Sequence, residues 1–263
     1  MSICVFGDIN KLYTNMICRE LHENKRDFYI ISERHKKSRT NSISKIFNAK
    51  FNEPHIKQIP WYKLYRYKKI TRSFFNRRQS RYKNLFPQMM NISNFNSNIF
   101  YVKKINSDET LKIIENRKFK LGIFGDVGII NLNIINKFSL GCINAHPAPL
   151  PDCRGGGAIQ NTLLKNLPFS VSIHFVNEKI DGGDILSVSE IELEKSDNLD
   201  IVVAKLNLKS VSELVIVATN LIKKRDYKLI KNTGKLYLWK DCTYKKQKLA
   251  DQIFISRIKE LNN

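Results

Sequence analysis

The stretch GCINAHPAPLPDCRGGGAIQ, Gly141 to Gln160, sets two polar residues at the end of an apolar run and then continues with prolines and glycines. Its first six residues predict a buried strand. Residues two apart in a strand point to the same face, so Asn144 and His146 should project together. Pro147 favours an extended backbone at His146 and ends the strand there. The stretch therefore predicts a strand that delivers an amide and an imidazole to one place.

Strand and helix patterns alternate on both sides of this strand, which is typical of an α/β protein with a doubly wound, mostly parallel sheet. Only Gly7 stands at the first turn, so the dinucleotide fingerprint GxGxxG is absent. Strands are expected over residues 2–7, 28–32, 98–105, 119–125, 169–176 and 184–193, and helices over 8–24, 107–118, 131–137, 156–166 and from Leu199 to Leu221.

Two segments depart from this alternation. Residues from about 33 to 98 read as an insertion of short helices and loop, so the main domain is predicted over residues 1–225 with this insertion inside it. The stretch YKLIKNTGKLYLW, from Tyr227, predicts a hairpin that turns at Asn232 to Gly234. A short C-terminal hairpin and a basic tail are therefore expected over residues 226–263.

The positive charge is concentrated in the insertion. The formal net charge is +21, and residues 34–83 hold 16 Lys or Arg against a single acid, Glu53. One reading is a solvated basic surface. The other is attraction to a polyanion, either nucleic acid, a nucleotide-linked substrate or anionic lipid. Composition does not choose between them.

The cysteines and the N-terminus suggest a cytoplasmic protein. The five cysteines are scattered without a CxxC pair, which favours neither a disulfide framework nor a metal site and indicates a reducing compartment. The first residues do not resemble a signal peptide. The most apolar helical stretch, VSELVIVATNLI, is about half the roughly 20 residues that a membrane span needs, so no transmembrane segment is expected.

A carboxylate is expected to join Asn144 and His146. Asp181 lies in the turn of NEKIDGGDIL, between two predicted neighbouring strands, which should bring it to the same edge of the sheet. An amide, an imidazole and a carboxylate together suit acyl transfer to an amine. The alternatives are plain turn residues at all three positions. Arg154 before three glycines reads as an anion-binding helix start or as a loop. The remaining histidines read as structural (His174) or as surface residues (His22, His35, His55).

Two blocks, INAHPAPLPDCRGGGAIQ and SIHFVNEKIDGGDIL, resemble the signature of the folate-dependent formyltransferase family. That signature runs Asn-x-His-Pro, Leu-Pro, Arg-Gly and then Asp-x-Gly-x-Ile-Leu. The interval of 35 residues from His146 to Asp181 fits it, and the likeness extends over about residues 119–190. The resemblance implies a Rossmann-like formyltransferase core, with its layout closest to the sugar N-formyltransferases.

The resemblance also implies roles for these residues. The formyl donor would be 10-formyltetrahydrofolate, held largely by backbone groups of two loops. Asn144 would stabilise the oxyanion, His146 would move protons and Asp181 would orient His146, while Arg154 would bind the acceptor. No metal is implied. The donor-binding residues would be Phe124, Gly125, Asp126, Val127, Lys179, Ile180 and Asp181.

The acceptor implied by the resemblance is a primary amine, most consistent with a nucleotide-linked amino sugar. The sequence GDINKLYTN after the first strand lacks the phosphate loop of glycinamide ribonucleotide formyltransferases. Too few residues follow Leu186 for the C-terminal barrel of methionyl-tRNA formyltransferases, although the basic segment keeps that acceptor open. A non-catalytic RNA-binding or polyanion-binding protein on the same core also stays open, as does a homodimer.

Overall fold

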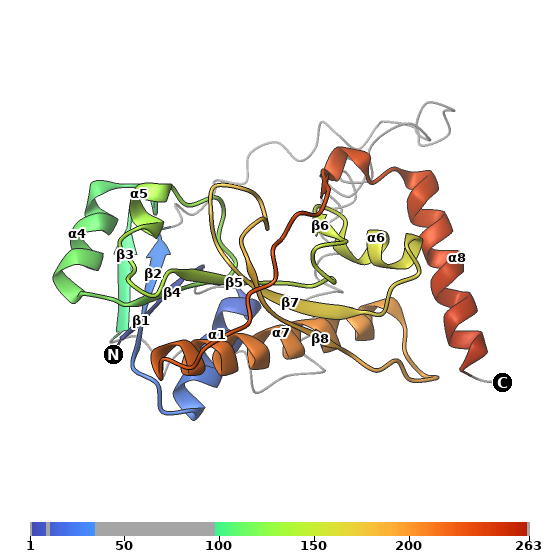
Figure 1. Cartoon of the computed structure of the whole chain (residues 1–263), viewed down its shortest axis with the longest axis horizontal. Helices are drawn as coiled ribbons and strands as arrows, with labels where there is room; N and C mark the ends of the chain where they lie inside the picture. The colour runs from blue at the N-terminus through green and yellow to red at the C-terminus, as the bar shows by residue number, and fades with distance from the viewer. Residues whose placement is uncertain (1, 9–10, 35–97, 262–263) are drawn as a thin grey trace, which may run out of the picture.

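A computed structural model describes residues 2–8, 11–34 and 98–261 (Figure 1). These residues form a seven-stranded sheet. The strand order is β3-β2-β1-β4-β5-β7-β8. The first five strands of this order pair in parallel, whereas β7 is antiparallel to both β5 and β8. The predicted mostly parallel sheet is therefore confirmed. Its strands are β1 (Ile3–Phe6), β2 (Phe28–Glu33), β3 (Ile99–Val102), β4 (Leu121–Phe124), β5 (Cys142–His146), β7 (Ser170–Phe175) and β8 (Ile185–Glu190).

Helices cover both faces of the sheet, as a doubly wound fold requires (Figure 1). Helices α1 (Leu12–Glu23) and α7 (Leu199–Ile222) pack on one face. Helices α4 (Asp108–Arg117) and α5 (Leu132–Ile135) pack on the other, over the strands near the N-terminus. Farther along the sheet, the loop after β5 lies against this second face, where Leu150 and Ala148 bond to the hydroxyl of Ser172 on β7.

The predicted interruption at about residues 33–98 falls between two neighbouring strands. Strand β2 ends at Glu33 and β3 begins at Ile99. Residues 35–97, including the basic positions Arg77, Arg78 and Arg81, lie outside the described residues. Among the helices of the described residues, none is both long and apolar enough to cross a membrane.

The expected C-terminal hairpin is not formed. Ile230 makes an antiparallel bridge to Ile185 at the start of β8. Strand β9 (Leu236–Tyr237) pairs in parallel with β6 (Arg154–Gly155). The two arms thus bond to separate parts of the main domain and not to each other. Gly234 packs so closely on Pro151 that a Cβ there would overlap its carbonyl, so the expected turn lies against the main domain.

The basic tail that was expected after the hairpin folds as a packed helix. Helix α8 (Tyr244–Glu260) lies against α6 (Ala158–Leu164), and its Phe254 ring contacts Phe169 edge to face. Arg257 donates to the carbonyl of Leu167. These contacts tie the last part of the chain to the main body. The division into domains 1–225 and 226–263 stays a prediction.

Candidate active site

Strand β5 presents Asn144 and His146 on one face, two residues apart, as the sequence predicts. The alternate residues, Ile143 and Ala145, are buried in the core beneath α1 and α7. This core fixes the orientation of the strand, because a slip by one residue would turn the polar pair into an apolar layer. The antiparallel neighbour β7 places His174 opposite Asn144.

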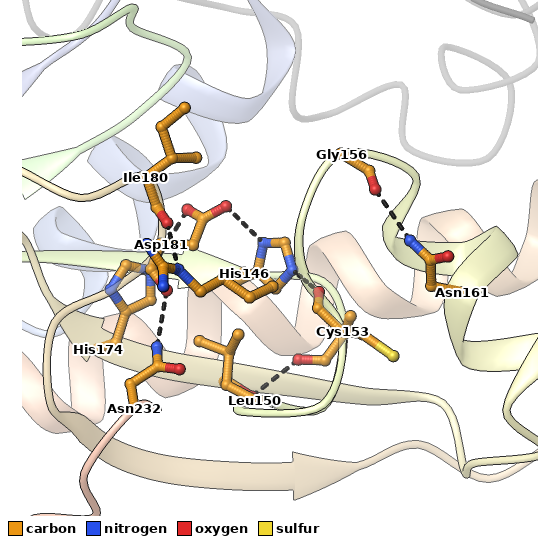
Figure 2. Close-up of polar contacts among 12 residues, drawn as sticks. His146, Leu150, Cys153, Gly156, Asn161, His174, Ile180, Asp181 and Asn232 are labelled. Carbon is orange, nitrogen blue, oxygen red and sulfur yellow. Dashed lines mark hydrogen bonds and ion pairs between the residues drawn. The ribbon is translucent and has the colours of Figure 1, made fainter. Parts of the chain in front are cut away.

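The imidazole of His146 is buried and fixed at one nitrogen (Figure 2). Its Nε2 lies 2.7 Å from the carbonyl oxygen of Cys153. A carbonyl only accepts, so Nε2 must carry the proton in this contact. In the neutral ring, Nδ1 then keeps a lone pair, and this atom lies 3.4 Å from Asp181 Oδ2. The ring is therefore set up to accept a proton at Nδ1.

Asp181 reaches His146 by a route that the sequence did not predict. The turn that carries Asp181 was expected at the same edge of the mostly parallel sheet as Asn144 and His146. Because β7 runs antiparallel to β5, the loop after β7 starts near the opposite end of β5, where Val176 donates to Cys142. The loop then folds back over the sheet face, with Asp181 at a left-handed φ of 43°. The predicted proximity of Asp181 to His146 is confirmed by the distance of 3.4 Å, but the path of the loop differs from the expected one.

His174 is a member of the site that sequence reasoning missed. It was read as a structural residue of an alternating strand, and it is 2% exposed. Its Nδ1 lies 2.8 Å from the Phe175 carbonyl, and its Nε2 lies 3.6 Å from Asp181 Oδ1. Asp181 thus sits between two imidazoles (Figure 2). The signal in the sequence was the polar face of SVSIHF, where Ser170, Ser172 and His174 alternate with apolar residues.

The surroundings shift the pKa values of both groups downward. Burial lowers the pKa of His146, and this outweighs the opposing effects of Asp181 and the Cys153 carbonyl. Burial alone would raise the pKa of Asp181, but the contacts with His174, His146 and Arg154 outweigh it and lower the pKa. At neutral pH the site therefore holds a neutral His146 beside an ionised Asp181. A proton that arrives at Nδ1 gains a carboxylate partner that the neutral ring cannot use.

Asn144 supplies an uncommitted amide next to this pair. The residue is partly exposed, and its side chain makes no hydrogen bond to any residue within 2–8, 11–34 or 98–261. An amide with two free N–H donors beside a proton acceptor can stabilise an oxygen that becomes negative. The expected role of Asn144 as an oxyanion donor stays a prediction.

The guanidinium of Arg154 binds backbone carbonyls of the protein. Its Nε donates to Ile180 O at 2.7 Å, and Nη1 lies 3.4 Å from Gly234 O. Arg154 therefore supports the loop that carries Asp181. The expected role of Arg154 in binding the acceptor stays a prediction.

The residues expected to hold the donor lie on two loops. Phe124 is buried at the end of β4, where its ring contacts Phe6 edge to face. Beyond it, Asp126 pairs with Lys11 at 2.6 Å. On the first loop, the N–H of Gly125 donates to the carbonyl of Phe6, and the N–H of Val127 donates to the carbonyl of Gly125. On the second loop, the N–H of Lys179 donates to the Asn177 side chain, and the carbonyl of Ile180 accepts from Arg154. Their role toward a donor stays a prediction.

Comparison with known proteins points to one family. Residues 124–218 match the family model described as "Formyl transferase". A methionyl-tRNA formyltransferase of Bacillus velezensis is 29% identical over 122 residues, which cover 46% of this chain and 38% of that protein. The match thus spans little more than a third of the length of this relative.

Two solved structures share the fold. A 4-N formyltransferase from Francisella tularensis has a TM-score of 0.55 at 19% identity, covering 91% of this chain and 77% of its own. A sugar N-formyltransferase from a Shewanella species has a TM-score of 0.57 at 17% identity, covering 98% and 87%. The matched segment contains Asn144, His146, His174 and Asp181. The resemblance read from the sequence is therefore confirmed over residues 124–218, the part of this chain that matches the formyl transferase family.

Proposed function

We propose that this chain transfers a formyl group from 10-formyltetrahydrofolate to a primary amine. One observation carries the proposal: His146 has its Nε2–H fixed on a carbonyl and its bare Nδ1 3.4 Å from an ionised carboxylate, within the segment that matches the family. Formyl transfer needs a group that takes a proton from an amine and returns it to a leaving nitrogen. His146 meets both requirements.

The reaction follows from the three polar side chains. The amine attacks the formyl carbon, a new C–N bond forms, and the carbonyl oxygen becomes negative. The amide of Asn144 donates to that oxygen. The proton lost by the amine goes to His146 Nδ1, where Asp181 stabilises the resulting imidazolium. The tetrahedral intermediate then collapses, the bond to N10 breaks, and His146 returns the proton to N10. The products are a formamide and tetrahydrofolate.

The donor would lie between the loop after β4 and the loop that carries Asp181. Carbonyls accept two hydrogen bonds, so a backbone oxygen such as Ile180 O can still accept from a pterin amine. Exposed apolar side chains on both loops, Ile129 at 79% and Ile180 at 48%, offer contact to its rings. At Gly128 a Cβ would meet nothing within 4 Å, so the tip of the first loop is open. These features fit a flat heteroaromatic donor.

For the acceptor, we propose a nucleotide-linked amino sugar. Two solved proteins with this fold, a sugar N-formyltransferase and a 4-N formyltransferase, support this class. The ammonium groups of Lys165 and Lys235 lie 5.3 and 5.7 Å from the centre of the Tyr237 ring. Tyr237 belongs to β9, which pairs with the strand β6 that holds Arg154. Positive charge at this place suits a diphosphate.

Charged methionyl-tRNA is the second candidate, because the sequence relatives carry that name. The basic composition of residues 34–83 is compatible with a nucleic acid. Glycinamide ribonucleotide is a third acceptor for the same chemistry. A non-catalytic polyanion-binding protein is the contrasting class, and an ordered base, oxyanion donor and carboxylate argue against it.

The test is a screen of acceptors with 10-formyltetrahydrofolate. UDP- and dTDP-linked amino sugars, charged initiator tRNA and glycinamide ribonucleotide would be incubated separately with the protein, and mass spectrometry would detect the gain of one formyl group. We expect formylation of an amino sugar. Exclusive formylation of tRNA would reject the amino sugar as the acceptor, but it would support formyl transfer to an amine. No transfer to any amine in the panel by the folded protein would count against the enzyme itself.

A further inference from the structure

The segment from Ile230 to Tyr237, here called the strap, connects the two loops that contact the His146 ring. One of these loops carries Cys153, whose carbonyl accepts from Nε2, and the other carries Asp181, which faces Nδ1. The strap runs from Ile230, which forms a bridge with Ile185 at the start of β8, to Tyr237, which pairs with β6. It is therefore placed to set the separation of the two partners of His146.

The strap is fixed at each end by backbone pairing. At its start, Ile230 and Ile185 exchange two hydrogen bonds of 3.0 and 2.8 Å. At its end, Tyr237 accepts from Gly156 N at 2.7 Å, next to the parallel pairing of β9 with β6. In the middle, Gly234 contacts the backbone of Pro151 at a distance that leaves no room for a side chain.

Between these fixed ends, the side chain of Asn232 bonds to Asp181 itself. Asn232 Nδ2 donates to the backbone carbonyl of Asp181 at 2.7 Å (Figure 2). The same loop is held from the other side by Arg154, which donates to Ile180 and also contacts Gly234 of the strap. Residue 181 has a left-handed φ of 43°, which an aspartate adopts less readily than the extended or helical regions. A fixed donor on its carbonyl compensates for that cost.

We propose that Asn232 is a positioning residue, whose amide holds the Asp181 backbone so that the carboxylate stays beside Nδ1 of His146. The inference rests on the proposed roles of His146 and Asp181. Other groups around this carboxylate are His174 on β7 and Arg154 on β6. The neighbouring ion pair of Lys231 with Asp184 is a surface contact, with the Lys231 side chain 79% exposed, and it takes no part in the proposal.

The inference is tested on the ligand-free protein by nitrogen NMR of the His146 ring during a pH titration. In Asn232→Ala the carboxylate is released while burial of the ring remains, so the pKa of His146 should fall below its value in the parent chain. Lys231→Ala is the matched control and should titrate like the parent. A His146 titration that is unchanged in folded Asn232→Ala would overturn the proposal.

A second variant covers a failure of Asn232→Ala to fold. Asn232→Gln keeps the amide but moves it by one methylene, and it should shift the same His146 titration in the same direction by a smaller amount. If an acceptor is known, kcat should fall on the order of 10- to 100-fold in Asn232→Ala, with KM for the donor unchanged. A shifted pKa of His146 supports the positioning role of Asn232 even if the parent chain transfers no formyl group. An unchanged pKa of His146 rejects the positioning role of Asn232 even if the parent chain is active.

Discussion

Replacing Asp181 with asparagine removes one charge from the site and little else. Asparagine is nearly isosteric with aspartate, and it tolerates the left-handed backbone better than most residues, so Asp181→Asn should keep the φ of 43°. The variant should therefore fold. Its effect should come from the loss of the negative charge beside His146.

The distance in the structure gives the size of that effect. A proton taken up by His146 creates a positive charge 3.4 Å from Asp181 Oδ2, and at an effective dielectric constant of about 20 the attraction is about 5 kcal/mol. Since about 1.4 kcal/mol corresponds to a factor of ten in rate, the ceiling is between 10³ and 10⁴. The asparagine oxygen still accepts a hydrogen bond and recovers part of this. We expect kcat to fall about 10²- to 10³-fold.

The assay is formyl transfer to the acceptor found in the screen, with kcat and KM measured separately. The acceptor KM should change little, because the charge acts on an imidazolium that forms only during the reaction. Asp184→Asn is the matched control: it lies three residues on in the same loop, and its carboxylate pairs with the exposed Lys231. Turnover by Asp181→Asn within threefold of the parent would refute this reasoning.

Four further outcomes are expected. His146→Ala should fold and lose about 10²- to 10⁴-fold in formyl transfer, and near-normal turnover would exclude the proton-transfer role. Burial lowers the pKa of His146 in the folded state, so the unfolded chain binds more protons than the folded chain below pH about 6.5. The free energy of unfolding, measured by urea titration, should therefore decrease as the pH falls through that region. His146→Gln should weaken this pH dependence, and the same pH dependence in the variant and the parent would contradict the argument. Gly234→Ala should lower the free energy of unfolding by about 1–3 kcal/mol, because its Cβ would overlap Pro151. Gly128→Ala should leave the free energy of unfolding unchanged, because a Cβ there meets nothing within 4 Å. Equal melting temperatures for the two variants would reject the packing argument. Binding of an amino-sugar nucleotide should weaken only slightly with salt, because it brings two phosphates to the protein. Tight binding and formylation of charged initiator tRNA, with a log–log slope of several units, would contradict the sugar proposal.

Local patterns were enough to predict the strand that carries Asn144 and His146. The period of two in GCINAH places Asn144 and His146 on one face, and the structure has them on one face of β5. The order of strands and helices also follows from local apolar runs. The interruption between β2 and β3 was visible as a change in composition.

Pairing between distant segments was not available from such patterns. The antiparallel register that sets His174 opposite Asn144 depends on β7 meeting β5 from the reverse direction, which no local spacing encodes. The turn signal around Gly234 was read as a hairpin because Asn and Gly favour tight turns. In the structure, Gly234 is needed for close approach to Pro151, and the flanking residues pair with β8 and β6.

The most direct test is transfer of a carbon-13-labelled formyl group from 10-formyltetrahydrofolate to an amine, followed by mass spectrometry for the parent chain and for His146→Ala. If His146 is the proton acceptor that Asp181 supports, the parent chain should place the label on the amine of a nucleotide-linked sugar, and the folded variant should place almost none. Equal labelling by the parent and the variant, or labelled product from neither with any amine of the panel, would contradict formyl transfer at His146.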